Sequence, residues 1–155
     1  MFNGGKPSIL IVDDDMGILN AFRKIFQKKG YAVTVAEKGL EAIEKLSMRQ
    51  YDVTLIDLSL PGMKGSALFP LIKNSSPKTL RILLTGKAWL QPSVEDADAF
   101  FEKPIKPDKL LNIIDTELKK RDTEPSFISE PPVYITKMHQ IKLNVHVFSS
   151  VQSNA

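Results

Sequence analysis

Acidic residues follow two short apolar runs of the sequence, where packing alone would not place a charge. The run VTLI at 53–56 ends on Asp57, and the run SILIV at 8–12 is followed by Asp13 and Asp14. Such runs are typical of buried strands. In parallel sheets the chemistry collects at the carboxyl ends of the strands. A buried strand that ends on a carboxylate therefore predicts a site at that end.

Carboxylates at neighbouring strand ends would need a cation. If the two strands are neighbours, Asp13, Asp14 and Asp57 lie within several ångströms of one another, and unit charges 4 Å apart repel by about 4 kcal/mol at an effective dielectric near 20. Carboxylate oxygens and water suit Mg²⁺. Thr85 ends a further apolar run, and Lys103 follows another. A single ammonium balances one charge, so the cluster predicts a magnesium site.

Each of these residues has an ordinary alternative when it is taken alone. An acidic residue after a strand is usually a helix N-cap, which is the role that we expect for Asp15. Alone, Thr85 reads as a hydroxyl at the end of a strand, and Lys103 as a solvated surface charge. The combination of these residue types at the same end of four strands favours a functional site.

The elements that would position these residues alternate between strand and helix. Apolar, β-branched runs predict strands, and apolar residues at helical spacing predict helices. In the helix at 38–50, Leu40, Ile43 and Leu46 form the expected buried stripe. Short connections between alternating elements predict an α/β fold with a parallel sheet covered on both faces. The predicted strands are 8–12, 31–36, 52–57, 79–86 and 98–104, and the predicted helices are 16–29, 38–50, 66–73 and 107–120.

Composition narrows the class of protein. The chain has 155 residues and a net charge of +3, with no basic run, so we expect no direct nucleic-acid binding. No cysteine is present, which excludes disulfides, thiolate metal sites and a cysteine nucleophile. The sequence contains no apolar stretch long enough to cross a membrane and no recognisable secretory signal. A cytoplasmic protein without a membrane contact is the expectation.

The motifs at these strand ends resemble the receiver domain of bacterial two-component response regulators, the CheY-like family. The match rests on ILIVDDD, DVTLIDLSLPGMKG, RILLTG and AFFEKPIK, in the family's order. The resemblance implies a flavodoxin-like, doubly wound (βα)5 sandwich with a five-stranded parallel sheet of order 2-1-3-4-5. It covers residues 7 to 120, and we expect a receiver domain at 1–121 followed by a linker and tail at 122–155.

The resemblance also implies a phosphorelay. Asp57 would be the phosphoacceptor, taking a phosphoryl group from a phosphohistidine of a sensor histidine kinase or a phosphotransfer protein. Asp14 would bind Mg²⁺ directly and Asp13 through a water molecule. Asp57 and the backbone carbonyl of Ser59 would complete the protein ligands. No other cofactor is implied.

Two further residues would contact the phosphoryl group, and a third would change position when they do. By resemblance, Lys103 would pair with one phosphate oxygen and Thr85 would donate its hydroxyl to another. Phe100, three residues before the lysine, would be the switch residue, although an apolar strand residue is an equally good interpretation. The chain would then be a phosphoacceptor that assists its own phosphorylation and dephosphorylation, not an enzyme, and it would regulate a downstream protein.

The sequence departs from the family between Thr85 and Lys103, where it has fewer residues than usual. This leaves room for a shortened fourth helix, which Pro92 would start. In the family, that helix belongs to the surface that usually contacts the output partner or a second copy of the domain. A conventional partner surface is therefore not predicted, and a homodimer is one possibility. Lys64 stands where an acidic residue is common. Ser59 and Lys87 occupy positions that tune the phosphate lifetime.

The tail resembles no family. EPSFISEPP at 124–132 reads as a linker, and VYIT at 133–136 and IKLNVHVF at 141–148 read as short strands. They would form a hairpin, pair with a sheet edge or stay disordered. His139 and His146 lack partner ligands, so no metal site is expected there.

Four other functions share part of this pattern. A receiver fragment of a larger regulator, with a DNA-binding or enzymatic effector, is the nearest alternative. An aspartyl-phosphate phosphatase would normally need a second aspartate where Ser59 stands. A phosphate-independent interaction domain would be expected to lack Asp57, Thr85 or Lys103, and all three are present. A flavodoxin-like cofactor site would need a glycine-rich loop after the first strand.

Overall fold

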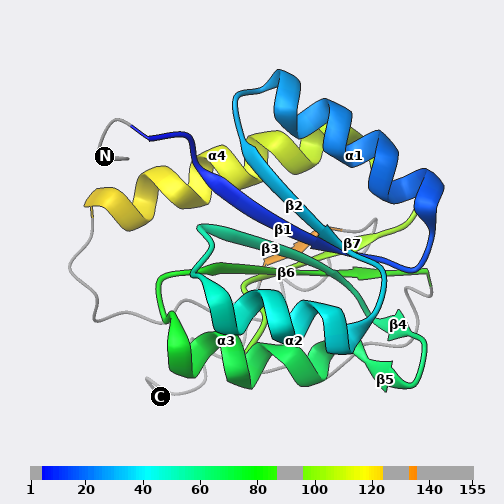
Figure 1. Cartoon of the computed structure of the whole chain (residues 1–155). Coiled ribbons are helices and arrows are strands. Elements are labelled where there is room, and N and C mark those ends of the chain that lie inside the picture. Colours follow the sequence, from blue (N-terminus) through cyan, green and yellow to red (C-terminus); the bar gives the residue numbers. More distant parts are fainter. Residues whose placement is uncertain (1–4, 87–95, 124–132, 136–155) are drawn as a thin grey trace, which may run out of the picture.

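The main sheet is parallel and has helices on both of its faces (Figure 1). The computed structural model describes residues 5–86, 96–123 and 133–135. Its strand order is β2-β1-β3-β6-β7-β8, and the first five reproduce the predicted order 2-1-3-4-5. The predicted α/β fold is confirmed. The strands are β1 Ser8–Val12, β2 Ala32–Ala36, β3 Val53–Asp57, β6 Leu80–Thr85, β7 Ala99–Glu102 and β8 Val133–Ile135.

The helices form two layers, with α1 and α4 on one face of the sheet and α2 and α3 on the other (Figure 1). Alternate residues of each strand serve the two layers. In β1, Ile9 and Ile11 join the cluster under α1 and α4, whereas Leu10 and Val12 join the cluster over α2 and α3. The helices are α1 Met16–Lys28, α2 Gly39–Met48, α3 Phe69–Ser75 and α4 Pro107–Thr123.

The start and end of α1 follow the sequence signals. The side chain of Asp15 accepts hydrogen bonds from the backbone N–H groups of Gly17 and Ile18, at 2.8 and 3.2 Å. Asp15 is therefore the N-cap that was predicted. After the helix, Gly30 adopts a positive φ of 89°, a conformation that glycine takes without steric cost.

The helix predicted at 66–73 is divided into two segments. A 3-10 turn, η1 Gly65–Leu68, precedes α3, and Pro70 lies in the first turn of α3. Pro70 has no N–H to donate to the carbonyl of Ser66, so the α-helical bonding pattern cannot cover this turn. The Phe69 N–H bonds to the Ser66 carbonyl instead, as a 3-10 turn requires.

The prediction that Leu40 lies on the buried stripe of α2 is wrong, because its exposed fraction is 79%. The buried stripe begins one residue earlier, on Gly39 and Ala42, and continues through the partly buried Ile43 and Leu46. These positions follow the i, i+3, i+4, i+7 spacing of one helix face. A Cβ at Gly39 would lie 1.9 Å from the sulfur of Met63, so a larger residue there would require the Met63 side chain to move.

Part of the tail pairs with the edge of the sheet, which is one of the three predicted alternatives. β8 runs parallel to β7, with Val133 opposite Ala99 and Ile135 opposite Phe101. The second predicted tail strand, 141–148, lies outside the described residues. Most of the region predicted to hold a shortened fourth helix, 87–95, also lies outside them, and the described remainder, 96–98, is not helical.

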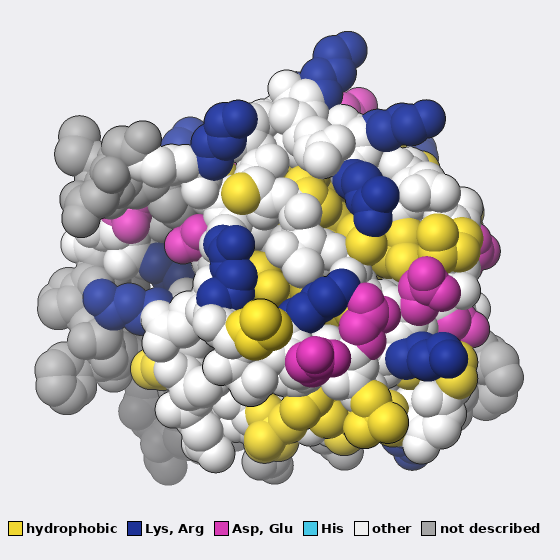
Figure 2. Space-filling model, in the orientation of Figure 1, with side chains coloured by type: hydrophobic (Ala, Val, Ile, Leu, Met, Phe, Trp, Pro, Cys, Tyr) yellow, Lys and Arg dark blue, Asp and Glu magenta, His cyan; other side chains and the backbone are white. Residues whose placement is uncertain are grey.

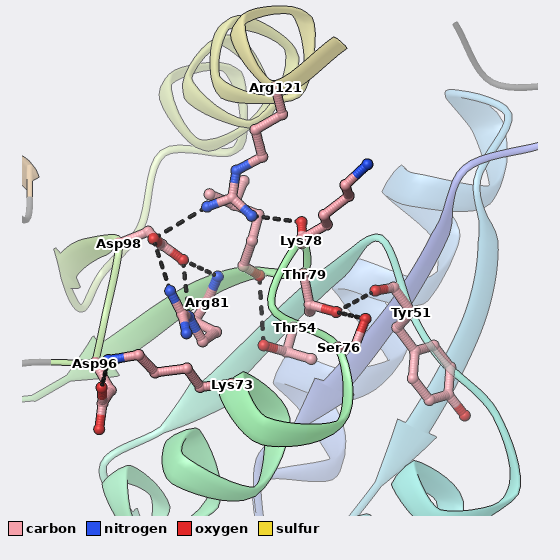
Figure 3. A network of polar contacts seen from close by, with 11 residues as sticks. Tyr51, Thr54, Lys73, Ser76, Lys78, Thr79, Arg81, Asp96, Asp98 and Arg121 are labelled. Carbon is pink, nitrogen blue, oxygen red and sulfur yellow. Dashed lines mark hydrogen bonds and ion pairs between the residues drawn. The ribbon is translucent and has the colours of Figure 1, made fainter. Parts of the chain in front are cut away.

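A polar network ties α4 to the amino ends of β6 and β7 (Figure 3). Arg81 is 8% exposed, and its guanidinium bonds to both carboxylate oxygens of Asp98, at 3.0 and 3.1 Å. Arg121 of α4 contacts the same carboxylate at 3.0 Å and donates to the carbonyl of Lys78 at 2.5 Å. One carboxylate thus joins two strands and a helix.

Candidate functional site

The three predicted carboxylates converge at the carboxyl ends of β1 and β3. One ligand oxygen from each of Asp13, Asp14 and Asp57 lies within 4.8 Å of the other two. β1 and β3 are paired neighbours, with Val12 opposite Ile56, so the residues that follow them meet at one edge. Asp13 and Asp57 are buried and Asp14 is exposed. The donor set therefore has two fixed oxygens and one that faces solvent, which fits a hard cation that keeps some of its water.

Lys103 lies beside the two buried carboxylates. Its Nζ is 2.6 Å from Oδ2 of Asp13 and 3.4 Å from Oδ1 of Asp57. The other oxygen of Asp13 accepts from the backbone N–H of Asp15 at 2.9 Å. Both oxygens of Asp13 thus have a partner, whereas the Asp57 carboxylate makes the longer contact with Lys103.

Thr85 and Lys103 are brought together by the pairing of β6 and β7. The backbone N–H of Lys103 donates to the carbonyl of Thr85 at 2.8 Å. Thr85 is 6% exposed and ends β6, next to β3 and its terminal Asp57. Phe100 is 3% exposed and belongs to the apolar cluster that α2 and α3 cover. The side chains predicted to form the site therefore lie at the carboxyl end of the sheet. Phe100 is the exception, because it lies within β7 and packs in the apolar core.

Burial raises the pKa of Asp57, and the neighbouring charge of Asp13 acts in the same direction. Lys103 and the backbone N–H of Ser59 oppose the rise without cancelling it. Burial alone would lower the pKa of Lys103, but its contacts with Asp13 and Asp57 outweigh burial and raise that pKa. The lysine is therefore a positive charge beside both buried carboxylates, and burial makes ionisation of Asp57 less favourable than in water.

A hairpin shapes the chain after Asp57. β4 Ser59–Leu60 and β5 Met63–Lys64 pair antiparallel, and Gly62 between them has a φ of 77°. Ser59 is exposed, and its backbone N–H is the group that bonds to Asp57. The predicted role of the Ser59 carbonyl as a metal ligand stays a prediction.

Gly65 is a site residue that the sequence analysis missed. A Cβ at this position would lie 1.9 Å from the carbonyl oxygen of Asp57, closer than any real contact. Its N–H bonds to the carbonyl of Leu58 at 2.8 Å, which folds the hairpin back against the end of β3. The second glycine of PGMKG was the available signal, because a glycine shortly after a strand often marks a close backbone approach.

The surface near these elements carries mixed charge. On the face that Figure 2 draws, Lys and Arg side chains are interspersed with acidic, apolar and uncharged ones. This face therefore shows none of the continuous basic patches that nucleic-acid binding uses. Among the described helices, none has the length and apolar character needed to cross a membrane.

Comparison with known proteins agrees with this geometry. The family model of the response regulator receiver domain matches residues 9–115. The transcriptional regulatory protein GlrR of Escherichia coli K12 is 32% identical over 120 residues, covering 74% of this chain and 27% of that protein. The chain thus spans about a quarter of the length of that relative.

Solved receiver domains share the fold. A CheY-like receiver domain protein from Methanospirillum hungatei JF-1 has a TM-score of 0.73 and 34% identity, covering 78% of this chain and all of that one. The response regulator TrrA from Thermotoga maritima, solved with Mg²⁺ and BeF, has a TM-score of 0.66 and 27% identity, covering 72% of this chain and 98% of its own. The chain belongs to the family of response regulator receiver domains of two-component systems.

Proposed function

We propose that Asp57 accepts a phosphoryl group from the phosphohistidine of a sensor histidine kinase or phosphotransfer protein. The observation that carries this proposal is the geometry of Asp57. Its carboxylate is buried at a strand end, 3.4 Å from the Lys103 ammonium and within 4.8 Å of two further carboxylates. A carboxylate nucleophile beside a positive charge suits attack on an electrophilic phosphorus.

In the proposed step, an Oδ of Asp57 attacks the phosphorus in line with the bond to the histidine nitrogen. The new O–P bond forms as the P–N bond breaks, and the nitrogen leaves with the electron pair and takes up a proton from solvent. The protein mainly positions the groups and stabilises the charge. Lys103 pairs with one oxygen of the transferred group, and Thr85 donates its hydroxyl to another.

The acidic cluster supports a magnesium requirement. Asp13, Asp14 and Asp57 would hold Mg²⁺, together with the backbone carbonyl of Ser59, and Asp13 would act through a water molecule. When bound, Mg²⁺ withdraws charge from the phosphoryl oxygens and fixes their direction. Lys103 compensates one of three carboxylates, so the donor set retains the net negative charge that a divalent cation needs.

Output would come from a shift between two conformations. Attraction of Thr85 toward the phosphoryl group moves the end of β6, and Phe100 on the paired strand responds. The Thr85–Lys103 backbone bond supports this coupling, because it joins the two residues that would contact phosphate.

We further infer a receiver domain at 1–121, with a linker and tail at 122–155, that controls a downstream protein in the cytoplasm. Neither direct nucleic-acid contact nor membrane contact by this chain is part of the proposal. A receiver segment of a larger regulator is the second candidate, because the chain covers 27% of GlrR, a transcriptional regulatory protein.

The test is the intact mass of the chain after incubation with acetyl phosphate and Mg²⁺. The expected gain is one phosphoryl group, which EDTA and the Asp57→Asn substitution each abolish. Glu44→Gln, an exposed acid on α2, is the matched control and should be labelled like the parent. No gain in folded protein with saturating Mg²⁺ would refute the proposed chemistry and favour a phosphate-independent interaction domain.

A further inference from the structure

The sixth strand of the sheet lies beyond the part of the chain that matches the receiver family. That match ends at residue 115, whereas β8 spans Val133–Ile135. β8 pairs in parallel with β7, with Tyr134 opposite Phe100. The tail therefore returns to the sheet and covers the edge of β7.

Backbone alternation identifies the residue of β7 that faces the tail. The backbone groups of Leu80 and Leu84 in β6 point toward β3. The N–H of Leu80 donates to the carbonyl of Asp52 at 2.9 Å, and the carbonyl of Leu84 accepts from the N–H of Leu58 at 2.8 Å. The residues between them, including Leu83, therefore face β7, as the Lys103–Thr85 bond shows for the end of the ladder.

In β7, the same alternation turns Ala99, Phe101 and Lys103 toward β6 and turns Phe100 toward β8. Given the register, the N–H of Ile135 and not that of Tyr134 faces β7. The backbone contact between tail and domain is therefore centred on Phe100.

Phe100 is also the residue on which the proposed switch depends. It is 3% exposed, and Lys103 follows three positions later in the chain. Lys103 contacts Asp13 at 2.6 Å and Asp57 at 3.4 Å, so pairing with a phosphoryl group on Asp57 would change these contacts at the end of β7. A strand paired on both sides resists such a shift more than an edge strand does.

The end of α4, which precedes the tail in the sequence, is also held in place. Arg121, two residues before the end of α4, is held by the carboxylate of Asp98 and the carbonyl of Lys78 (Figure 3). Asp98 directly precedes β7. The end of α4 is thus anchored beside the strand that the tail joins, and nine residues, 124–132, link Thr123 to Val133. A tether of this length gives the tail a high effective concentration at the β7 edge.

We propose that the edge of β7 at Phe100 is an interaction surface whose occupant is the chain's own segment Val133–Ile135, and that docking of this segment slows phosphorylation of Asp57. This inference rests on the proposed function. A three-residue ladder is short enough to open without unfolding the domain. By linkage, phosphorylation then favours release of the tail, which frees the edge for another strand.

Two proline substitutions in the full chain test the docking. Ile135→Pro removes the N–H that faces β7, whereas Tyr134→Pro removes one that faces away and is the matched control. Amide hydrogen exchange by NMR should show faster exchange at Phe100 in Ile135→Pro and not in Tyr134→Pro. Phe101, whose N–H faces β6, should be unchanged in both. Equal protection of Phe100 in the parent and in Ile135→Pro would overturn the docking.

The rate of phosphorylation by acetyl phosphate with Mg²⁺ tests the linkage. We expect Ile135→Pro to react about threefold faster than the parent, and Tyr134→Pro to match the parent. An equal or slower rate for Ile135→Pro overturns the linkage but leaves the phosphoacceptor role intact. If none of the three chains is labelled, the proposed function fails and the linkage fails with it, while hydrogen exchange still decides the docking.

Discussion

Replacing Asp57 with Asn should stabilise the metal-free protein at neutral pH. Burial is the largest cost to the charge on Asp57, and repulsion by Asp13 adds to it, at about 3.5 kcal/mol for unit charges 4.8 Å apart at an effective dielectric of 20. Lys103 at 3.4 Å attracts it by about 5 kcal/mol on the same scale. Lys103 thus offsets the repulsion by Asp13, and the cost of burial is what keeps the charge on Asp57 unfavourable.

Since burial outweighs the help from Lys103, we expect Asp57→Asn to raise the free energy of unfolding by about 1–2 kcal/mol. For a chain of this size, the melting temperature should rise by about 2–8 °C in EDTA at pH 7. Glu44→Gln, which removes an exposed charge, should change the free energy of unfolding by less than about 0.5 kcal/mol.

The pH dependence of this gain follows from the raised pKa of Asp57. Its proton is bound more tightly in the folded protein than in the unfolded chain, where the ordinary value is 3.8. Below pH 3.8 Asp57 is protonated in both states and does not lower the free energy of unfolding of the parent. That free energy falls as pH rises through the folded pKa of Asp57. The advantage of Asp57→Asn should be near zero at low pH and grow toward neutrality.

Mg²⁺ should reverse the ranking. At a concentration of 100 Kd, a ligand that binds only the folded state adds about 2.7 kcal/mol. Asp57→Asn lacks one of the proposed ligand oxygens and should gain less. Thermal melts with and without Mg²⁺ measure both effects. A lower melting temperature for Asp57→Asn in EDTA at pH 7 would refute the argument that the buried charge of Asp57 destabilises the metal-free protein.

Two further predictions concern the supports of the site. Lys103→Met leaves the fully buried Asp13 without its cation and should lower the free energy of unfolding by about 3–5 kcal/mol, measured by urea denaturation; an unchanged midpoint would contradict the ion pair. Gly65→Ala places a Cβ 1.9 Å from the Asp57 carbonyl oxygen and should cost about 1–3 kcal/mol by the same assay. Gly5→Ala, where no atom lies within 4 Å, is its control and should cost little.

The sequence predicted the position of the carboxylates because strand ends carry positional information. An apolar run is buried as a strand, and parallel strands end at a common edge of the sheet. A charge directly after such a run therefore lies at that edge. Asp13, Asp14 and Asp57 therefore meet as expected, and Lys103 joins them across the sheet.

Other features depend on contacts that spacing alone does not encode. Gly39, on the buried face of α2, lies against Met63 from a distant segment of the sequence, while its neighbour Leu40 is exposed. The contacts of Arg81 and Arg121 with one carboxylate, Asp98, join three elements without any local pattern. Alternation in the tail predicted a strand, but the sequence did not identify β7 as its neighbour.

The central claim is that Asp57, and neither of the carboxylates beside it, carries the phosphoryl group. The most direct measurement is borohydride reduction of the chain after treatment with acetyl phosphate and Mg²⁺, followed by peptide mapping. Reduction converts an aspartyl phosphate to homoserine. The account predicts homoserine at position 57 alone. Homoserine at position 13 or 14, or at no position in protein that is folded and metal-loaded, would contradict it.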